Sequence, residues 1–410
     1  NCYKLFYSKE CRDCADGTFL LDCIGCTDCY GCVGLRNKKY HIFNQPQSKE
    51  DYLKIVGEKK KEMLDGNIDK LKDEFIKFAL KYPNKYAYIQ KSVDSSGDYL
   101  LNTKKCTFCF HGYDAEDCKY GYHVWRNSKD NMDVCTVGRD AELVYETINT
   151  GMGIYNVKFG IQNWNGNRDL QYSEACSGSQ NLFGCTALRT KEYCILNKQY
   201  TKEEYEDLVS KIMKHMNDNP YTDKNGHVYK YGEFFPPEIS FFAYNETSAN
   251  DHFPLIKESA ETKGYYWKEK EKRSISPTLK HDELSKYNSD IPDSLTGEII
   301  SCKNEGRETY CTEAFKVIAR ELEFYRKMNL PLPEFCPNCR HYQRLKQRNP
   351  LKLWHRKCQC NGNESENGIY TNTIAHQHGT EPCPNEFETT YSPDRKEIVY
   401  CERCYQQEVV

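Results

Sequence analysis

Two pairs of cysteines near the C-terminal end of this 410-residue chain have the spacing of metal-binding knuckles. Cys336-Pro-Asn-Cys339 and Cys401-Glu-Arg-Cys404 each place two thiols on one tight turn, where both can reach the same tetrahedral ion. Zinc is the ion for which this spacing is typical, and each pair needs two further ligands. A catalytic zinc keeps one position for water, whereas nearby cysteines can fill both sites. The spacing therefore predicts two structural zinc ions.

The remaining ligands are sought beside the two pairs. Cys302 and Cys311 lie upstream of the first pair, on the far side of the predicted helix FKVIARELEFYRKM. The segment before the second pair offers several alternatives, which spacing alone leaves open: Cys358, Cys360, Cys383, His376 and His378.

Cys23, Cys26, Cys29 and Cys32 form a C-x2-C-x2-C-x2-C run that suggests an iron–sulfur cluster or a further zinc ion. An internal repeat tests this idea. The 24 residues from 29 to 52 match those from 182 to 205 at eleven positions, with an offset of 153. The same offset aligns the four cysteines with Cys176, Ser179, Leu182 and Cys185. A cluster would lose half its ligands, so we favour stacked interior packing in both copies.

The repeat also predicts the fold class. Short strand-like pieces with polar corners recur at intervals of about 9 to 16 residues, often with an Asp, Asn or Glu just before an apolar patch, which favours a stacked parallel fold. Two-residue hairpin turns, which a β-sandwich would use, are scarce. We predict a mainly β protein with helical inserts: a parallel β-solenoid in two related stretches, followed by a tandem zinc-ribbon module. The predicted parts are solenoid coils 1–46, a helical insert 47–91, a second solenoid copy 92–219 with a capping helix, an extended charged arm 220–300, and the zinc-ribbon module 301–410.

Capping signals place the helices. Ser48 is the predicted N-cap of the insert, with Asp51 three residues later, and Gly66 is expected to break the helix. Thr201 and Glu204 repeat the same cap before the second helix.

Composition limits the class of protein. The 23 cysteines are odd in number, and the sequence has no stretch with the length and apolarity of a signal peptide or a membrane span. We therefore expect reduced thiols, a cytoplasmic location and no membrane partner. The chain begins at Asn1 within a cysteine-rich run, so we also expect it to be a fragment of a longer protein. Nothing in the sequence indicates an oligomeric state.

A local excess of positive charge is the main signal for a partner. The net charge is only −3, but residues 335–363 contain no Asp or Glu, and their seven Lys and Arg residues are interleaved with aromatic and His side chains. Such a stretch could contact phosphates and stack on bases. A basic linker paired with the acidic arm is the alternative. The candidate nucleic-acid-binding residues are Arg340, Arg344, Lys346, Arg348, Lys352, Trp354, Arg356 and Lys357.

Five segments carry a resemblance to a known family: LRNKKYHIFNQPQSKEDY, LRTKEYCILNKQYTKEEY, YGEFFPPEISFFAYNET, FYRKMNLPLPEFCPNCRHYQRLKQRNPLKLWHRKC and FETTYSPDRKEIVYCERCY. They resemble the Cys-rich zinc-ribbon proteins that are abundant in predicted proteomes of Candidate Phyla Radiation bacteria. The resemblance implies Cys358 and Cys383 as the further ligands of the second knuckle. The family more often has a C-x2-C where this chain has Cys302 and Cys311. Longer members carry another zinc-ribbon pair before the solenoid. The family has no known function to transfer.

Three functions remain as hypotheses. The first is a non-catalytic zinc protein that binds nucleic acid or a ribonucleoprotein through its basic C-terminal module. The second is a protein–protein interaction scaffold, with purely structural zinc and a Tyr-rich solenoid face. The third, which we favour least, is a solenoid-type carbohydrate-active enzyme or an iron–sulfur redox protein. Common catalytic signatures such as a nucleophile elbow, a phosphate-binding loop or a zinc-protease motif are missing from the sequence.

Overall fold

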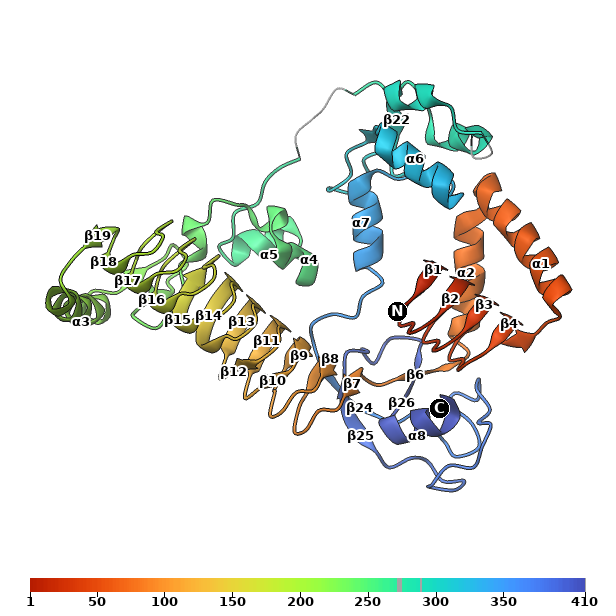
Figure 1. Cartoon of the computed structure of the whole chain (residues 1–410), viewed down its shortest axis with the longest axis horizontal. Helices are drawn as coiled ribbons and strands as arrows, with labels where there is room; N and C mark the ends of the chain where they lie inside the picture. Colours follow the sequence, from red (N-terminus) through yellow and green to blue (C-terminus); the bar gives the residue numbers. More distant parts are fainter. Residues whose placement is uncertain (271–274, 288–289, 410) are drawn as a thin grey trace.

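The computed structural model describes residues 1–270, 275–287 and 290–409. It is mainly β, with several parallel sheets and a smaller number of helices, which confirms the coarse fold class (Figure 1). Within this described part, no helix is both long enough and apolar enough to cross a membrane.

The N-terminal sheet has four parallel strands and one short antiparallel strand. Each parallel strand pairs with the strand twelve residues further on, as in Ala15 with Thr27 and Thr27 with Lys39. The chain therefore completes one turn every twelve residues. The strands are β1 Tyr3–Phe6, β2 Ala15–Thr18, β3 Thr27–Tyr30, β4 Lys39–Ile42 and β5 Gln45–Pro46.

The central sheet repeats this arrangement over a longer path, visible as the row of strands from β7 to β19 in Figure 1. The register is twelve residues from β8 to β11, thirteen from β11 to β16 and twelve from β16 to β18. Its strands are β7 Ile89–Gln90, β8 Gly97–Leu101, β9 Cys109–Tyr113, β10 Ala115–Glu116, β11 Lys119–Val124, β12 Ser128–Lys129, β13 Met132–Val137, β14 Glu142–Thr150, β15 Tyr155–Ile161, β16 Arg168–Gln171, β17 Gln180–Phe183, β18 Glu192–Ile195 and β19 Lys198–Gln199.

A left-handed backbone conformation at every third residue produces these turns. In the N-terminal sheet, Asp22, Gly25, Asp28 and Gly31 all have positive φ, and each directly precedes a buried cysteine. Asp, Asn and Gly tolerate this left-handed conformation best, so they occupy many of the corners. Every third side chain then points into the turn, where its row is continued by the neighbouring turns.

Helices cover one face of the N-terminal sheet. The insert forms α1 Lys49–Glu62 and α2 Ile68–Ala79, joined by a π-helical kink Met63–Asn67 in which Gly66 has a φ of 90°. Phe19 of the sheet packs against Phe75 of α2, with ring centroids 5.7 Å apart. The predicted N-caps are confirmed, because Ser48 accepts from the backbone of Asp51 and Thr201 forms a complete capping box with Glu204.

The second capping helix, α3 Lys202–Asp218, packs on β18 at the far end of the central sheet. The segment after it is more structured than the predicted extended arm. It contains a hairpin of β20 Tyr221–Thr222 and β21 Val228–Tyr229, and the short helices α4 Ser248–His252 and α5 Lys257–Thr262. Tyr231 donates to the Gln171 side chain at 2.7 Å, so its first part lies on the central sheet. Residues 271–274 and 288–289 of the predicted arm lie outside the described residues.

The C-terminal part of the chain forms two units with separate hydrophobic cores, which lie apart in Figure 1. The first unit contains β22 Ile300–Ser301, β23 Ala314–Phe315, α6 Ala319–Met328 and α7 Pro337–Leu345, and its core begins upstream at Leu284. The second contains β24 Trp354–Lys357, β25 Glu386–Thr389, β26 Ile398–Tyr400 and α8 Glu402–Val409.

The second unit joins the two large sheets. Its strand β26 pairs in parallel with β6, Pro83–Lys85, in the linker between them. Thr390 donates to the buried carboxylate of Asp98 in the central sheet at 2.8 Å. The hydroxyl of Tyr405 donates to Asp22 in the N-terminal sheet. This unit therefore contacts both sheets and the linker.

Candidate metal centres

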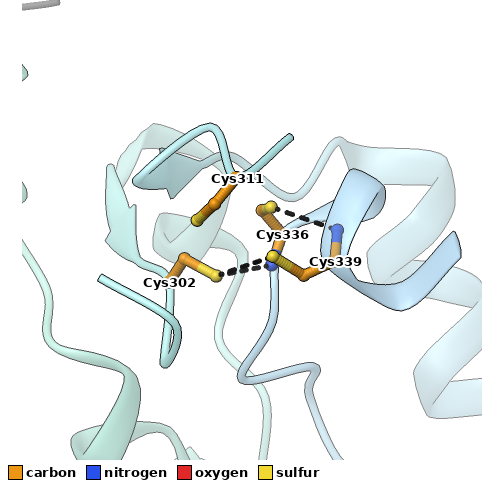
Figure 2. Close-up of side chains that lie close together, drawn as sticks. All are labelled: Cys302, Cys311, Cys336 and Cys339. Atoms are coloured by element: carbon orange, nitrogen blue, oxygen red, sulfur yellow. Dashed lines mark hydrogen bonds between the residues drawn. The ribbon is translucent and has the colours of Figure 1, made fainter. Parts of the chain in front are cut away.

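The first centre brings together Cys302, Cys311, Cys336 and Cys339, all buried, with sulfurs within 4.8 Å of one another (Figure 2). Cys302 comes from the end of β22 and Cys311 from the loop before β23, while the knuckle pair opens α7. Four sulfurs about 2.3 Å from a tetrahedral ion lie about 3.8 Å apart. The Cys302 and Cys339 sulfurs are 3.8 Å apart, which matches that edge. This group could hold a metal ion.

Donors around the first centre point at sulfur. The backbone N–H of Cys336 donates to the Cys302 sulfur at 3.2 Å, and the side-chain amide of Asn304 donates to the Cys339 sulfur, also at 3.2 Å. Burial alone would raise the pKa of the Cys336 thiol, but hydrogen bonds from Thr312 and from the Cys339 backbone lower it to about 7. The thiolate is the metal-binding form, so these contacts favour that form at Cys336, whereas burial raises the pKa of the Cys302 thiol to about 11.

The second centre contains Cys358, Cys383, Cys401 and Cys404, again all buried and within the same distance limit. Cys358 follows β24, and the knuckle begins directly after β26 and continues into α8, which contains Cys404. The Cys383 and Cys401 sulfurs are 3.9 Å apart, and the Cys401 N–H donates to the Cys358 sulfur at 3.2 Å. The structure therefore places in one group the two ligands that the family resemblance implied, Cys358 and Cys383.

The alternative ligands form a third group instead of competing for the second. Cys360, His376 and His378 converge with Cys404, which is thus common to both groups. The sequence predicts two ions, whereas the described residues form three Cys/His groups that could hold a metal ion.

The Cys23 to Cys32 run is arranged as a packing ladder. All four cysteines are fully buried. Each sulfur lies near the carbonyl oxygen two residues before it and the one nine residues after it: for Cys26 these are Ile24 at 3.5 Å and Leu35 at 3.4 Å. Ser179 of the second copy makes the first of these bonds with its hydroxyl, at 3.1 Å to Ser177. Within the described residues, the run is not among the groups whose ligand atoms converge for a metal.

We expect the aerobically purified protein to be colourless, because this run packs and does not bind iron. Cys26→Ser should leave the spectrum unchanged and cost only about 1 kcal/mol of unfolding free energy, since serine fills equivalent positions and keeps the carbonyl hydrogen bond. Absorption spectra of the wild type and the variant provide the measurement. A visible iron–sulfur band that disappears in Cys26→Ser would show that the run binds a cluster.

The predicted nucleic-acid-binding residues are spread over α7, the linker after it and β24, and most have partners inside the chain. Arg340 pairs with Glu321 at 3.2 Å, Lys346 with Glu308 at 3.5 Å and Lys357 with Glu386 at 3.4 Å. These three ion pairs neutralise part of the local positive charge.

Two further basic residues donate to backbone carbonyls: Arg348 reaches Asp251 at 3.5 Å and Arg356 reaches Ser392 at 3.3 Å. Arg344 and Lys352 have no ion-pair partner among the described residues, and Lys352 lies 5.0 Å from the ring centre of Trp354. Three of the seven basic side chains are therefore ion-paired, and two more are held by backbone carbonyls.

Sequence reasoning missed the groups that support the sulfurs. Asn304 donates to the Cys339 sulfur, Asn385 to that of Cys401 at 3.4 Å and Asn372 to that of Cys360 at 3.2 Å. Glu408, which holds His376, was missed as well. Asn385 and Asn304 each lie two residues after a ligand cysteine, which is a weak signal that could have indicated them.

The comparisons with known proteins add no relative: the chain matches no protein-family model, no curated protein and no solved structure.

Proposed function

We propose that this protein is a non-catalytic interaction scaffold: two β-solenoid segments held at a fixed angle by zinc-stabilised C-terminal units, with a protein as the partner. The observation that carries the proposal is the contact of the second metal unit with both parallel sheets. The scaffold was the second of the three functions that the sequence suggested. Internal pairing of the basic stretch moves it ahead of nucleic-acid binding.

Zinc is the metal that best suits these sites. Two sets of four buried thiols, each closed to water, are the ligand set of structural zinc, and small units of this kind gain their folding free energy from the ion. The N–H donors to sulfur supply the surrounding hydrogen bonds that such sites use. We interpret the two units as zinc ribbons on this basis.

The solenoid interpretation explains why contacts between the second unit and both parallel sheets matter. Registers of twelve or thirteen residues and left-handed corners fit stacked turns in which each contacts only its neighbours. The two segments meet directly where the Tyr99 hydroxyl of the central sheet donates to the Glu10 carboxylate beside the N-terminal sheet. The second unit adds the hydrogen bonds from Thr390 to Asp98 and from Tyr405 to Asp22, together with a 2.9 Å ion pair between Lys85 and Glu402.

Aromatic rows on the central sheet are the proposed partner surface. Phe108 and Tyr120 form one row, with tilted rings whose centroids are 6.0 Å apart, and Tyr113 with Trp125 forms a stacked row at 5.7 Å. Tyr120 is 55% exposed and Trp125 is 44% exposed. Rigid aromatic side chains contribute much contact area at low entropic cost, so they are common in protein interfaces.

Nucleic-acid binding is the second candidate. Arg344 and Lys352 keep their charges without an ion pair in the described structure, and Trp354 lies beside Lys352. Phosphate contacts by these residues would release counterions, so binding would weaken by about 0.9 log unit per contact for each log unit of salt.

We expect affinity purification of the tagged wild-type chain to yield a protein partner and no nucleic acid in the absorbance ratio at 260 and 280 nm. Tyr120→Ser with Trp125→Ser should lose that partner, because it removes the more exposed member of each row. Arg344→Gln with Lys352→Gln is the matched control and should retain it. Mass spectrometry of the eluates, quantified across the three proteins, provides the measurement.

The opposite pattern favours the nucleic-acid hypothesis. Salt-sensitive filter binding of RNA or DNA by the wild type, lost in Arg344→Gln with Lys352→Gln and retained in the aromatic variant, would replace the scaffold proposal. Phosphate contacts would make that loss similar for all sequences tested.

A further inference from the structure

Cys404 occupies an unusual position, because its sulfur belongs to two ligand groups at once. It lies within 4.8 Å of the sulfurs of Cys358, Cys383 and Cys401, and within the same limit of Cys360, His376 and His378 on the other side. Each group is complete as a tetrahedral set only when Cys404 is included. A thiolate has enough lone pairs to bind two ions.

Both histidines are held in the way that metal-binding histidines are held. One ring nitrogen of a ligating histidine donates to a carboxylate or a carbonyl, which directs the other nitrogen at the metal. Nε2 of His376 lies 2.9 Å from a carboxylate oxygen of Glu408, and its Nδ1 faces the Cys360 sulfur at 3.0 Å. Nδ1 of His378 lies 2.7 Å from the carbonyl of Glu381, and its Nε2 faces the Cys404 sulfur at 3.3 Å.

Burying the Glu408 carboxylate in the core of a small unit costs free energy. Its side chain and that of His376 are both fully buried. Burying a carboxylate is unfavourable unless it is hydrogen-bonded on all sides, and Glu408 accepts from the Tyr370 hydroxyl at 2.8 Å and from the Thr373 N–H at 2.9 Å. All of these contacts fix the position of one imidazole. An ion bound to Nδ1 of His376 accounts for a buried carboxylate that holds this imidazole in place.

We propose that a third zinc ion binds to Cys360, His376, His378 and Cys404, and that the Cys404 thiolate bridges it to the ion of the second centre. Two thiolates and two imidazoles form a common zinc set. The charge balance also favours the pair of ions. A zinc ion with four thiolates keeps two negative charges in a buried site, whereas two zinc ions with five thiolates and two neutral imidazoles keep only one.

The bridge adds a further link between two parts of the second unit, the loop 361–377 and α8, which the hydrogen bonds from Tyr370 and Thr373 to Glu408 already join. Cys360 directly precedes the loop 361–377 and His378 directly follows it, while His376 lies near the end of the loop. Cys404 lies on α8. The third ion would therefore anchor this loop to the helix that reaches the N-terminal sheet through Tyr405.

Metal counting on the full chain, purified with zinc under reducing conditions, tests the proposal. We expect three zinc ions in the wild type and two in His376→Gln with His378→Gln. His355→Gln is the matched control, because this histidine lies in the same unit but in none of the three groups, and it should keep all three ions. Cys302→Ser should subtract one ion by itself, so an unfilled first centre is not mistaken for an absent third ion.

Cadmium-113 NMR of the cadmium-loaded chain tests the bridge directly. Two of the three resonances should be split by the same coupling, which passes from one ion to the other through the shared sulfur. The double histidine variant should retain the all-sulfur resonance of the second centre without the splitting. If that variant does not fold, His378→Gln alone replaces a half-buried residue and should also remove the splitting. Two zinc ions in the wild type together with unsplit cadmium signals would overturn the proposal.

Discussion

Cys404→Ser should release metal from the second C-terminal unit and detach that unit from both parallel sheets. The unit spans only residues 354–409, too few to bury a large core, and its buried side chains gather around the cysteines. Structural zinc supplies on the order of 10 kcal/mol to units of this size, so losing a shared ligand should unfold it. The contacts of Tyr405 and Thr390 with the sheets would be lost together with it.

Metal analysis combined with limited proteolysis measures both effects. We expect at least one zinc ion fewer per chain and rapid cleavage after residue 353, while the parallel sheets keep their circular dichroism. Cys194→Ser is the matched control, because Cys194 is equally buried but packs in the central sheet, away from the metal groups. A Cys404→Ser protein with the metal content and protease resistance of the wild type would contradict the prediction.

Local signals in the sequence were sufficient for the coarse fold and for the cysteines that converge in the three Cys/His groups of the described residues. The knuckle pairs, the caps at Ser48 and Thr201, and the break at Gly66 depend on residues within a few positions of one another, and the structure contains all of them. The alignment of Cys26 with Ser179 correctly indicated packing positions, because both side chains are buried and bond to the carbonyl two residues earlier.

The regular turn could have been predicted more sharply. Acidic and amide residues before apolar patches were noticed, but not their period of three. Asp22, Gly25, Asp28 and Gly31 show this period without interruption, and the structure gives all four a positive φ. The reason is steric: each corner needs a left-handed residue, and Asp, Asn and Gly adopt that conformation at the lowest cost.

The parts that could not be predicted depend on distant contacts. The pairing of β26 with β6 joins Ile398 to Pro83, and neither short strand carries a signal for its partner. The three metal groups share the same difficulty, because Cys360 and His376 meet only after a long loop closes. Structure was needed to show that these residues form a separate group with Cys404.

The interior row of the central sheet provides the second large effect, which tests the stacked fold independently of metal. Leu170 is fully buried in β16 and pairs in register with Val157 on one side and Leu182 on the other, both also fully buried. Leu170→Ala should lower the free energy of unfolding by about 2–5 kcal/mol, because it leaves a cavity that rigid neighbouring turns cannot close.

Stacked turns contact only their neighbours, so the effect should be local. Hydrogen exchange should accelerate in β15, β16 and β17, while the N-terminal sheet and the metal content stay unchanged. Leu143→Ala is the matched control: Leu143 lies in the same sheet but is 41% exposed, and its truncation should change the unfolding free energy by no more than about 0.5 kcal/mol. Equal urea midpoints for the two variants would mean that the row from Val157 to Leu182 is not the core of the sheet, and the solenoid interpretation would fail with it.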